Sequence, residues 1–460
     1  MMKNILSIAV LLAASAVVLT GCKNEEDDLF SSSAAERLSE SQVTLTKRLS
    51  GTAWVMEYYP LGTFELDPET RDPYPAGLGY VILNRFNADG SVEQAMQNAV
   101  SLNYYINDTS LWQIISDQGP VLSFNTFNNC IHTFSDPGVN NSTMNLYQGR
   151  GYEGDYEFGV LDMKESADVV MLKGKKRGTY IRMVKLPFDT DFKTYLSDVN
   201  AFTEKMFSAS APNNSEVFLG DTTFVMTKAS KGIAELYPVG GDPISQSTDH
   251  VFTITQRNGK YYMRFLYNIG RSKCDAREFV YSATEDKFIC LENSAYSIQG
   301  PPAGKFFNES MIATHKWLLT RTSVMSDQMK TVYETMYNDF RKVGSGSYTL
   351  QNVQFSKIVD GSADNGKIKV DISYRNRNSV AHLLVYFDAT FGDQSFTLSN
   401  RQVQGNGQNI INAVPGIDTF LTTIETELSV AAGGSSFNMS TLKLTSAKDT
   451  NYTFVLNYII

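Results

Sequence analysis

Few residues of this chain have the types and spacing that catalysis by a histidine or a metal ion needs. Only four histidines occur among 460 residues, and none has a partner at the spacing of zinc ligands. The chain also lacks the Gly-x-Ser-x-Gly turn of serine hydrolases, a phosphate-binding P-loop and any recognisable serine or cysteine triad. We therefore expect no cofactor and no histidine-based metal site. The four histidines are His132, His250, His315 and His382.

Acidic side chains leave one route to hydrolysis open. Glycosidases need only two carboxylates that face a sugar, roughly 5 to 10 Å apart, and a sequence cannot show that spacing. Asp and Glu number 49 against 40 Lys and Arg, for a formal net charge of -9. A chain of this charge offers no basic surface for phosphates, so we expect no nucleic-acid partner. Enzyme activity stays open, with the noncatalytic alternative favoured.

Three carboxylates alternate after a glycine-rich segment. Glu153, Asp155 and Glu157 follow Gly149 and Gly151. On an incipient strand this alternation would put all three on one face. Hard cations such as Ca²⁺ prefer oxygen ligands, so a calcium site is a candidate here, although the loop does not match the EF-hand pattern. A solvated strand face is the simpler interpretation.

The amino terminus predicts a location outside the cytoplasm. Lys3 supplies a positive start, residues 5–19 form an apolar stretch, and Leu19-Thr20-Gly21-Cys22 matches the lipobox of bacterial lipoproteins. Residues 1–21 are thus expected to be a signal peptide, with Cys22 as the lipid attachment that anchors the protein to a membrane. The apolar stretch has 15 residues, which is shorter than the roughly 20 that a spanning helix needs.

Residues 22–33 have the composition of an acidic, serine-containing tether. Such a segment holds a folded domain away from the membrane whatever else it does. Its charged cluster also resembles the export signal that sends lipoproteins of Bacteroidota-type bacteria to the outer face of the outer membrane. This resemblance implies an outer-membrane lipoprotein exposed on the cell surface, with a periplasm-facing lipoprotein as the alternative. The cluster is Lys23, Glu25, Glu26, Asp27 and Asp28.

Three further cysteines are present, Cys130, Cys274 and Cys290, an odd number that cannot all pair within one chain. Cys274 and Cys290 flank two expected strands, 278–282 and 287–291, so a disulfide between them is a candidate. Cys130 lies in an apolar and aromatic run. We expect a buried thiol there and not a nucleophile.

The distribution of apolar residues predicts a mainly β protein with an α+β C-terminal part. Aromatic residues make up 12% of the chain and suit half-buried strands. Short aromatic and β-branched runs separated by turn signals continue from residue 54 to 186. Asn258-Gly259, between 251–255 and 261–267, is the strongest hairpin signal. We expect antiparallel sheets or barrel-like modules in tandem.

Changes in composition divide the mature chain into three modules. We expect an N-terminal antiparallel β domain over 34–190, a middle β module over 215–305 and a C-terminal α+β module over 306–460. Apolar periodicity predicts helices over 34–50, 192–207, 325–341 and 417–428.

A tryptophan opens both the first and the third module. The segments around Trp54 and Trp317 resemble the openings of lipocalin-like barrels. The lipocalin pattern places glycine two residues before the tryptophan, whereas Gly51 lies three residues before Trp54. A tryptophan that fills a sheet core is the simpler interpretation.

Four phrases between residues 121 and 178 resemble a known family. In this order they are similar to lipoproteins of gut Bacteroidota that are catalogued only as a domain of unknown function. The resemblance implies a shared fold and shared export but no activity. The last phrase is basic and predicts a charged hairpin tip, with anion contact as the alternative. The phrases are residues 122–128, 132–137, 149–158 and 172–178.

The favoured function is therefore that of a surface-anchored, noncatalytic lipoprotein. It would bind a nutrient ligand, a glycan or a peptide, or act as an accessory to an outer-membrane uptake porin, with aromatic side chains as stacking surfaces. The alternatives are an extracellular hydrolase with paired carboxylates and an adhesin or structural surface module. A cleft lined by aromatic rings would favour binding, and a deep pocket with two close carboxylates would favour hydrolysis.

Overall fold

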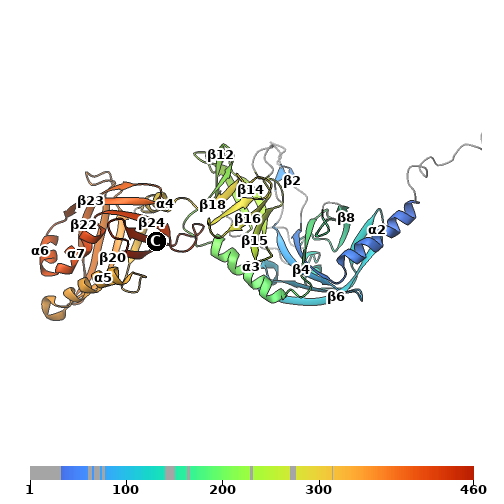
Figure 1. Ribbon diagram of the computed structural model, residues 1–460, viewed down its shortest axis with the longest axis horizontal. Helices are drawn as coiled ribbons and strands as arrows, with labels where there is room; N and C mark the ends of the chain where they lie inside the picture. The colour runs from blue at the N-terminus through green and yellow to red at the C-terminus, as the bar shows by residue number, and fades with distance from the viewer. Residues whose placement is uncertain are drawn as a thin grey trace, which may run out of the picture. The chain divides into compact units, whose positions relative to one another are not determined.

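The strands form three closed antiparallel barrels of eight strands each, which follow one another along the chain (Figure 1). This confirms the expected fold class, a mainly β chain with barrel-like modules in tandem. No helix in the described part is long and apolar enough to span a membrane. The structure is a computed structural model that describes residues 33–60, 65–66, 73–74, 78–139, 151–162, 166–227, 232–269, 276–312 and 314–460.

The described residues fall into two compact units. The larger unit contains residues 191–460 together with two segments of the first barrel's sequence, 57–81 and 96–105, and the smaller unit contains the rest of that barrel. All contacts described below lie within one unit or the other.

The first barrel follows helix α2 (Ala34–Leu49), which begins with a capping box between Ser33 and Glu36. A separate two-stranded ribbon pairs β2 (Glu65–Leu66) with β3 (Pro73–Tyr74). Two 3₁₀ turns, η2 (Ala99–Ser101) and η3 (His132–Phe134), lie in the connections. The barrel strands are β1 (Thr52–Tyr59), β4 (Tyr80–Phe86), β5 (Ser91–Met96), β6 (Ile106–Ser116), β7 (Pro120–Phe124), β8 (Glu157–Asp162), β9 (Val169–Gly174) and β10 (Tyr180–Leu186).

The second barrel follows helix α3 (Phe192–Phe207), which has the bounds that apolar periodicity predicts. The expected hairpin is confirmed, because Arg257 pairs with Lys260 across a turn in which Asn258 and Gly259 have φ of 50° and 72°. The strands are β11 (Ser215–Leu219), β12 (Thr222–Thr227), β13 (Ile233–Pro238), β14 (Thr248–Arg257), β15 (Lys260–Phe265), β16 (Glu278–Ser282), β17 (Lys287–Cys290) and β18 (Ser297–Gln299).

The third barrel follows helix α4 (Ala303–Ser310) and has helices α5 (Asp327–Phe340), α6 (Gly407–Ala413) and α7 (Pro415–Ile424), with a 3₁₀ turn η5 (Val343–Gly346). The predicted helix over 417–428 ends earlier, because Leu428 belongs to a strand and is fully buried there. The strands are β19 (Lys316–Leu319), β20 (Tyr348–Lys357), β21 (Ile368–Asn376), β22 (Ser379–Phe391), β23 (Ser395–Val403), β24 (Glu427–Ala432), β25 (Thr441–Ser446) and β26 (Thr453–Ile459).

The two tryptophans occupy equivalent places in the first and third barrels. Trp54 on β1 and Trp317 on β19 are both fully buried. The indole N–H of Trp54 donates to the carbonyl of Leu49 at 3.4 Å, and that of Trp317 to Oγ of Ser310 at 3.0 Å. Leu49 and Ser310 are the last residues of α2 and α4. Each opening is thus a helix followed by a strand whose tryptophan is tied to the helix end, and each leads into a closed barrel.

Candidate functional site

The three carboxylates of the calcium hypothesis lie in different surroundings. Glu153 has φ of 49°, and β8 begins only at Glu157, so the expectation that they alternate on one strand face is wrong. Asp155 is buried and accepts hydrogen bonds from the backbone N–H groups of Lys176 (3.0 Å) and Arg177 (2.9 Å). It therefore closes a turn. In the part of the chain that the structure describes, no group of three His, Cys, Asp or Glu side chains could hold a metal ion.

Several predicted site residues lie outside the described residues. They are Cys22 with the charged cluster Lys23, Glu25, Glu26, Asp27 and Asp28, and also Cys274. The lipid attachment, the export signal and the Cys274–Cys290 bridge therefore stay predictions.

Two cysteines are described, and neither has the surroundings of a reactive thiol. Sγ of Cys290 lies 3.1 Å from Oε2 of Glu292. Burial raises the pKa of the Cys290 thiol to about 11, so it is not activated as a thiolate. Cys130 is fully buried, as expected.

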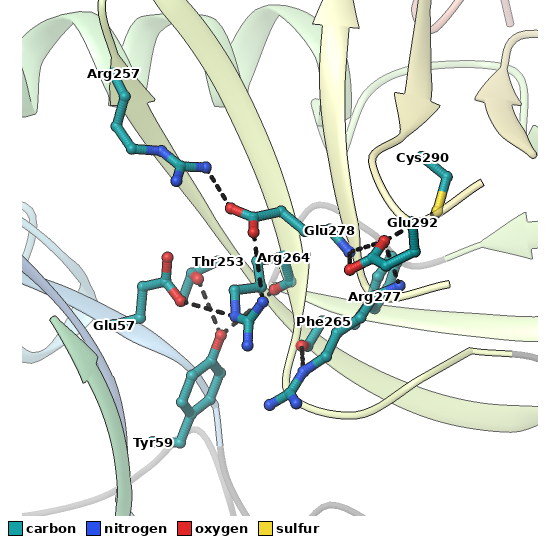
Figure 2. Close-up of polar contacts among 10 residues, drawn as sticks. All are labelled: Glu57, Tyr59, Thr253, Arg257, Arg264, Phe265, Arg277, Glu278, Cys290 and Glu292. Atoms are coloured by element: carbon teal, nitrogen blue, oxygen red, sulfur yellow. Dashed lines mark hydrogen bonds and ion pairs between the residues drawn. The ribbon is translucent and has the colours of Figure 1, made fainter. Parts of the chain in front are cut away.

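A group of buried charges surrounds Arg264 of β15 (Figure 2). Its guanidinium lies between two carboxylates, with Nε 3.3 Å from Oε2 of Glu57 and Nη1 3.5 Å from Oε2 of Glu278. Glu278 also pairs with Arg257, whose guanidinium stacks on the Tyr262 ring with Cζ 3.6 Å from its centroid. The side chains of Glu57, Glu278 and Arg264 are 0%, 7% and 11% exposed. We name these four charged residues, Glu57, Arg257, Arg264 and Glu278, the arginine–glutamate network.

Hydrogen bonds around the network complete a tightly packed structure. The Tyr59 hydroxyl lies 2.9 Å from Oγ1 of Thr253, and burial raises the pKa of Tyr59 well above its usual range. The carboxylate of Glu292 accepts the backbone N–H of Glu278 at 3.2 Å (Figure 2). A general acid and a nucleophile must face a substrate, whereas the network carboxylates face arginines. The network therefore does not favour hydrolysis.

Each of the four histidines has its own set of contacts. His132 stacks between two rings, His250 contacts the Phe265 ring, His315 contacts the Tyr458 ring, and Nδ1 of His382 lies 2.9 Å from a carboxylate oxygen of Asp371.

His250 predicts a stability loss in acid. Burial lowers its pKa from 6.5 to about 4. The folded state therefore binds this proton less tightly than the unfolded chain does. The stabilisation by neutral His250 is complete above pH 6.5 and is lost as the pH falls towards 4. Between pH 7 and pH 4 the free energy of unfolding of wild type should fall by up to about 3 kcal/mol more than that of His250→Gln. Urea unfolding of both proteins at the two pH values measures this difference. Parallel curves for the two proteins would contradict this expectation.

A cleft of about 380 Å³ is found in the described part of the chain. It lies in the larger unit, where β11, β12 and β13 of the second barrel meet α4 and β26. Its aromatic walls are Tyr237, Phe306 and Tyr458. Its other lining residues are Pro212, Asn213, Asn214, Ser215, Glu216, Val225, Pro301, Lys305, Glu309, Ser310, Ile312 and His315.

The cleft is lined by both positively and negatively charged side chains. Nζ of Lys305 lies 3.3 Å from Oε1 of Glu216, and their side chains are 43% and 17% exposed. The ring centroids of His315 and Tyr458 are 5.4 Å apart. The carboxylate of Glu216 can accept further hydrogen bonds from a ligand while it pairs with the ammonium group of Lys305.

A loop of the third barrel, residues 433–439, shapes the cleft through its hold on Asn213. The side-chain amide of Asn213 donates to the carbonyl of Ser436 at 2.9 Å, and its side-chain oxygen accepts the N–H of Met439, also at 2.9 Å. Asp286, in the turn between β16 and β17, accepts from the hydroxyl of Ser435 at 2.8 Å. These contacts fix the second barrel against the third within the larger unit.

Reasoning from the sequence missed this cleft. Of the candidate site residues weighed in the sequence, only His315 lines the cleft, and it was considered as a metal ligand and set aside. The lining comes from residues 212–237, 301–315 and 458, and no short motif joins such distant segments. The proline and asparagine clusters at 212–214 and 301–302 are the one local signal, since they mark connections where barrels meet.

Comparison with known proteins gives a family but no activity. The model of a domain of unknown function (DUF4302) matches residues 26–287. No curated protein matches the chain. The resemblance to a family catalogued only as a domain of unknown function is confirmed to this extent.

Solved structures resemble the chain only distantly. A double mutant of transferrin binding protein B from Haemophilus parasuis is 10% identical, with 89% of this chain and 76% of that one covered and a TM-score of 0.16. A DNA polymerase sliding clamp from Pseudomonas aeruginosa is 8% identical, with 89% and 99% covered and a TM-score of 0.16. Such low scores support no conclusion about function.

Proposed function

This chain belongs to the DUF4302 family, and we propose that it is a noncatalytic, lipid-anchored surface protein that binds a glycan or peptide ligand in the cleft. The observation that carries the proposal is the cleft itself. Its volume of about 380 Å³ falls within the range of roughly 300 to 1,000 Å³ that is typical of small-ligand sites.

The lining of the cleft suits a ligand with both apolar and polar edges. Tyr237 and Tyr458 offer ring surface over the buried Phe306, while Lys305, Glu216 and Glu309 offer charged donors and acceptors. Sugars and peptides both combine apolar faces with many hydrogen-bonding groups. Binding in such a site depends on a few well-placed polar contacts over an apolar wall.

The proposed location of the protein is inferred from its first residues. A lipid on Cys22 would anchor it, and the acidic cluster after Cys22 would direct it to the outer face of the outer membrane. There it would work beside an uptake porin and pass its ligand on. A periplasm-facing lipoprotein is the alternative location.

Lys305→Met tests the cleft. This change removes the ammonium group from the lining, and we expect it to weaken ligand binding about tenfold, which corresponds to roughly 1.4 kcal/mol for one charge-assisted contact. Isothermal titration of the mature chain with a panel of oligosaccharides and peptides measures the affinity. Lys330→Met, at an exposed position of α5, is the matched control and should bind like wild type.

Two results would contradict the proposal. One is equal affinity of Lys305→Met and wild type for every ligand that binds. The other is release of cleaved product during the titration, which would establish the hydrolase alternative.

A further inference from the structure

Three rings form an open stack in the loops between β7 and β8 of the first barrel. The ring centroids of Phe127 and His132 are 5.5 Å apart at an interplanar angle of 35°, and those of His132 and Tyr156 are 4.9 Å apart at 27°. The imidazole is the middle ring. Phe127 is 65% exposed and Tyr156 is 44% exposed. Rings that lie together at the surface offer an apolar face to a ligand.

A buried asparagine holds the stack in place. Asn128 is fully buried, and its backbone N–H donates to Nδ1 of His132 at 3.1 Å. Its side-chain oxygen accepts the N–H of Cys130 at 2.9 Å, and its amide nitrogen donates to Oγ of Ser110 at 3.2 Å. The loop that presents the rings is therefore ordered before any ligand arrives, which reduces the entropy lost on binding.

The stack carries no charge at neutral pH. Nδ1 of His132 already accepts an N–H, and burial lowers the pKa of the imidazole below its usual 6.5. A neutral ring between two others favours an uncharged partner that offers an apolar face.

The basic run beside the stack is balanced by carboxylates. Nζ of Lys175 lies 2.8 Å from Asp117 and 3.4 Å from Glu157, and Nη1 of Arg177 lies 3.6 Å from Glu153. With Asp155, four carboxylates lie among the four cations of this run, Lys173, Lys175, Lys176 and Arg177. Charge complementarity therefore favours a neutral ligand over a phosphate or a nucleic acid.

Polar residues adjoin Phe127 in the sequence. A carboxylate oxygen of Asp108 accepts the backbone N–H and the side-chain amide of Asn129, both at 2.8 Å. Asn129 is itself exposed next to Asn128. Asn129 follows Phe127 by two residues, so its amide lies in the segment that presents this ring.

We propose that the Phe127–His132–Tyr156 stack is a carbohydrate site, at which the apolar C–H face of a pyranose from a neutral glycan rests on an exposed ring while its hydroxyls reach the polar residues that adjoin Phe127. An uncharged sugar ring matches the open ring faces, the balanced charges and the flanking amide and carboxylate. The site lies in the smaller unit and does not depend on the cleft. It is a ligand site in addition to the one in the proposed function.

Affinity electrophoresis of the mature chain tests the site. The protein is run through native gels that contain β-glucan, mannan, xylan or glycogen. We expect at least one of these neutral polysaccharides to retard wild type, and Phe127→Ala to weaken that retention at least tenfold. Phe127→Leu keeps an apolar side chain and removes only the ring face, so it should behave like Phe127→Ala.

Two control variants separate this site from the cleft and from exposed aromatic surface in general. Phe188→Ala removes an accessible ring of the same unit, 48% exposed, and should be retarded like wild type. Lys305→Met alters the cleft and should keep retention through the stack, so failure of one proposal is distinguishable from failure of the other. The stack proposal is overturned if none of the four gels retards wild type, or if both Phe127 variants are retarded equally with it.

Discussion

Replacing Arg264 by methionine is expected to lower the free energy of unfolding by about 3 to 5 kcal/mol, the usual effect of removing one partner of a buried ion pair. Arg264 is the cation between Glu57, which is fully buried, and Glu278, which is 7% exposed. Without it, two carboxylates must be kept in a low-dielectric environment with less positive charge nearby. Urea unfolding at neutral pH measures the loss.

A double-mutant cycle identifies the cause of that loss. The double variant Glu57→Gln/Arg264→Met should lose less free energy of unfolding than the two single variants lose together. We expect the difference to be about 0.5 to 3 kcal/mol, because the two residues interact directly. Lys260 lies at an exposed position of the same strand, so Lys260→Met serves as the control. It should change the free energy of unfolding by no more than about 0.5 kcal/mol. Strict additivity of Glu57 and Arg264 would show that the contact is not a stabilising one.

Gly300→Ala is expected to disrupt the junction between the second and third barrels. A Cβ at position 300 would lie 1.9 Å from the carbonyl oxygen of Ser436. That backbone cannot easily retreat, because Asp286 accepts the N–H of Ser436 at 2.5 Å and Asn213 donates to its carbonyl at 2.9 Å. We expect a destabilisation of about 3 kcal/mol and weaker ligand binding in the adjoining cleft.

Gly434→Ala is the matched control for this change. Gly434 belongs to the same loop as Ser436, and a Cβ there would meet nothing within 4 Å. Calorimetry of both variants should therefore show a lower melting temperature for Gly300→Ala and an unchanged one for Gly434→Ala. Equal melting temperatures for Gly300→Ala and wild type would mean that the backbone at Ser436 can move to accommodate the added Cβ.

Elements that depend on neighbouring residues could be predicted from the sequence. The Asn258-Gly259 hairpin forms because these two residues adopt positive φ readily, and α3 forms over a stretch with regular apolar spacing. Trp54 and Trp317 marked the openings of two barrels, although their bonds to Leu49 and Ser310 were not foreseen. Local propensity and periodicity suffice where partners lie within a few residues.

Arrangements that join distant residues could not be predicted. The alternation of Glu153, Asp155 and Glu157 suggested one face, but backbone N–H groups at 176 and 177 capture Asp155 in a turn. The hydrolase alternative needed carboxylates that face a substrate. In the structure Glu57 meets Arg264, which lies 207 residues further along the chain.

The sequence by itself determined the class of fold, the hairpin, most helices and the expectation of a lipidated Cys22, because each is encoded in contiguous residues. Only the tertiary structure decided that the strands close into three barrels, that Lys305 and Glu216 line one cleft, and that Tyr156 completes the stack of Phe127 and His132. Barrel closure and side-chain packing bring these residues together, and the free energy of those contacts depends on the whole fold and not on any segment of it.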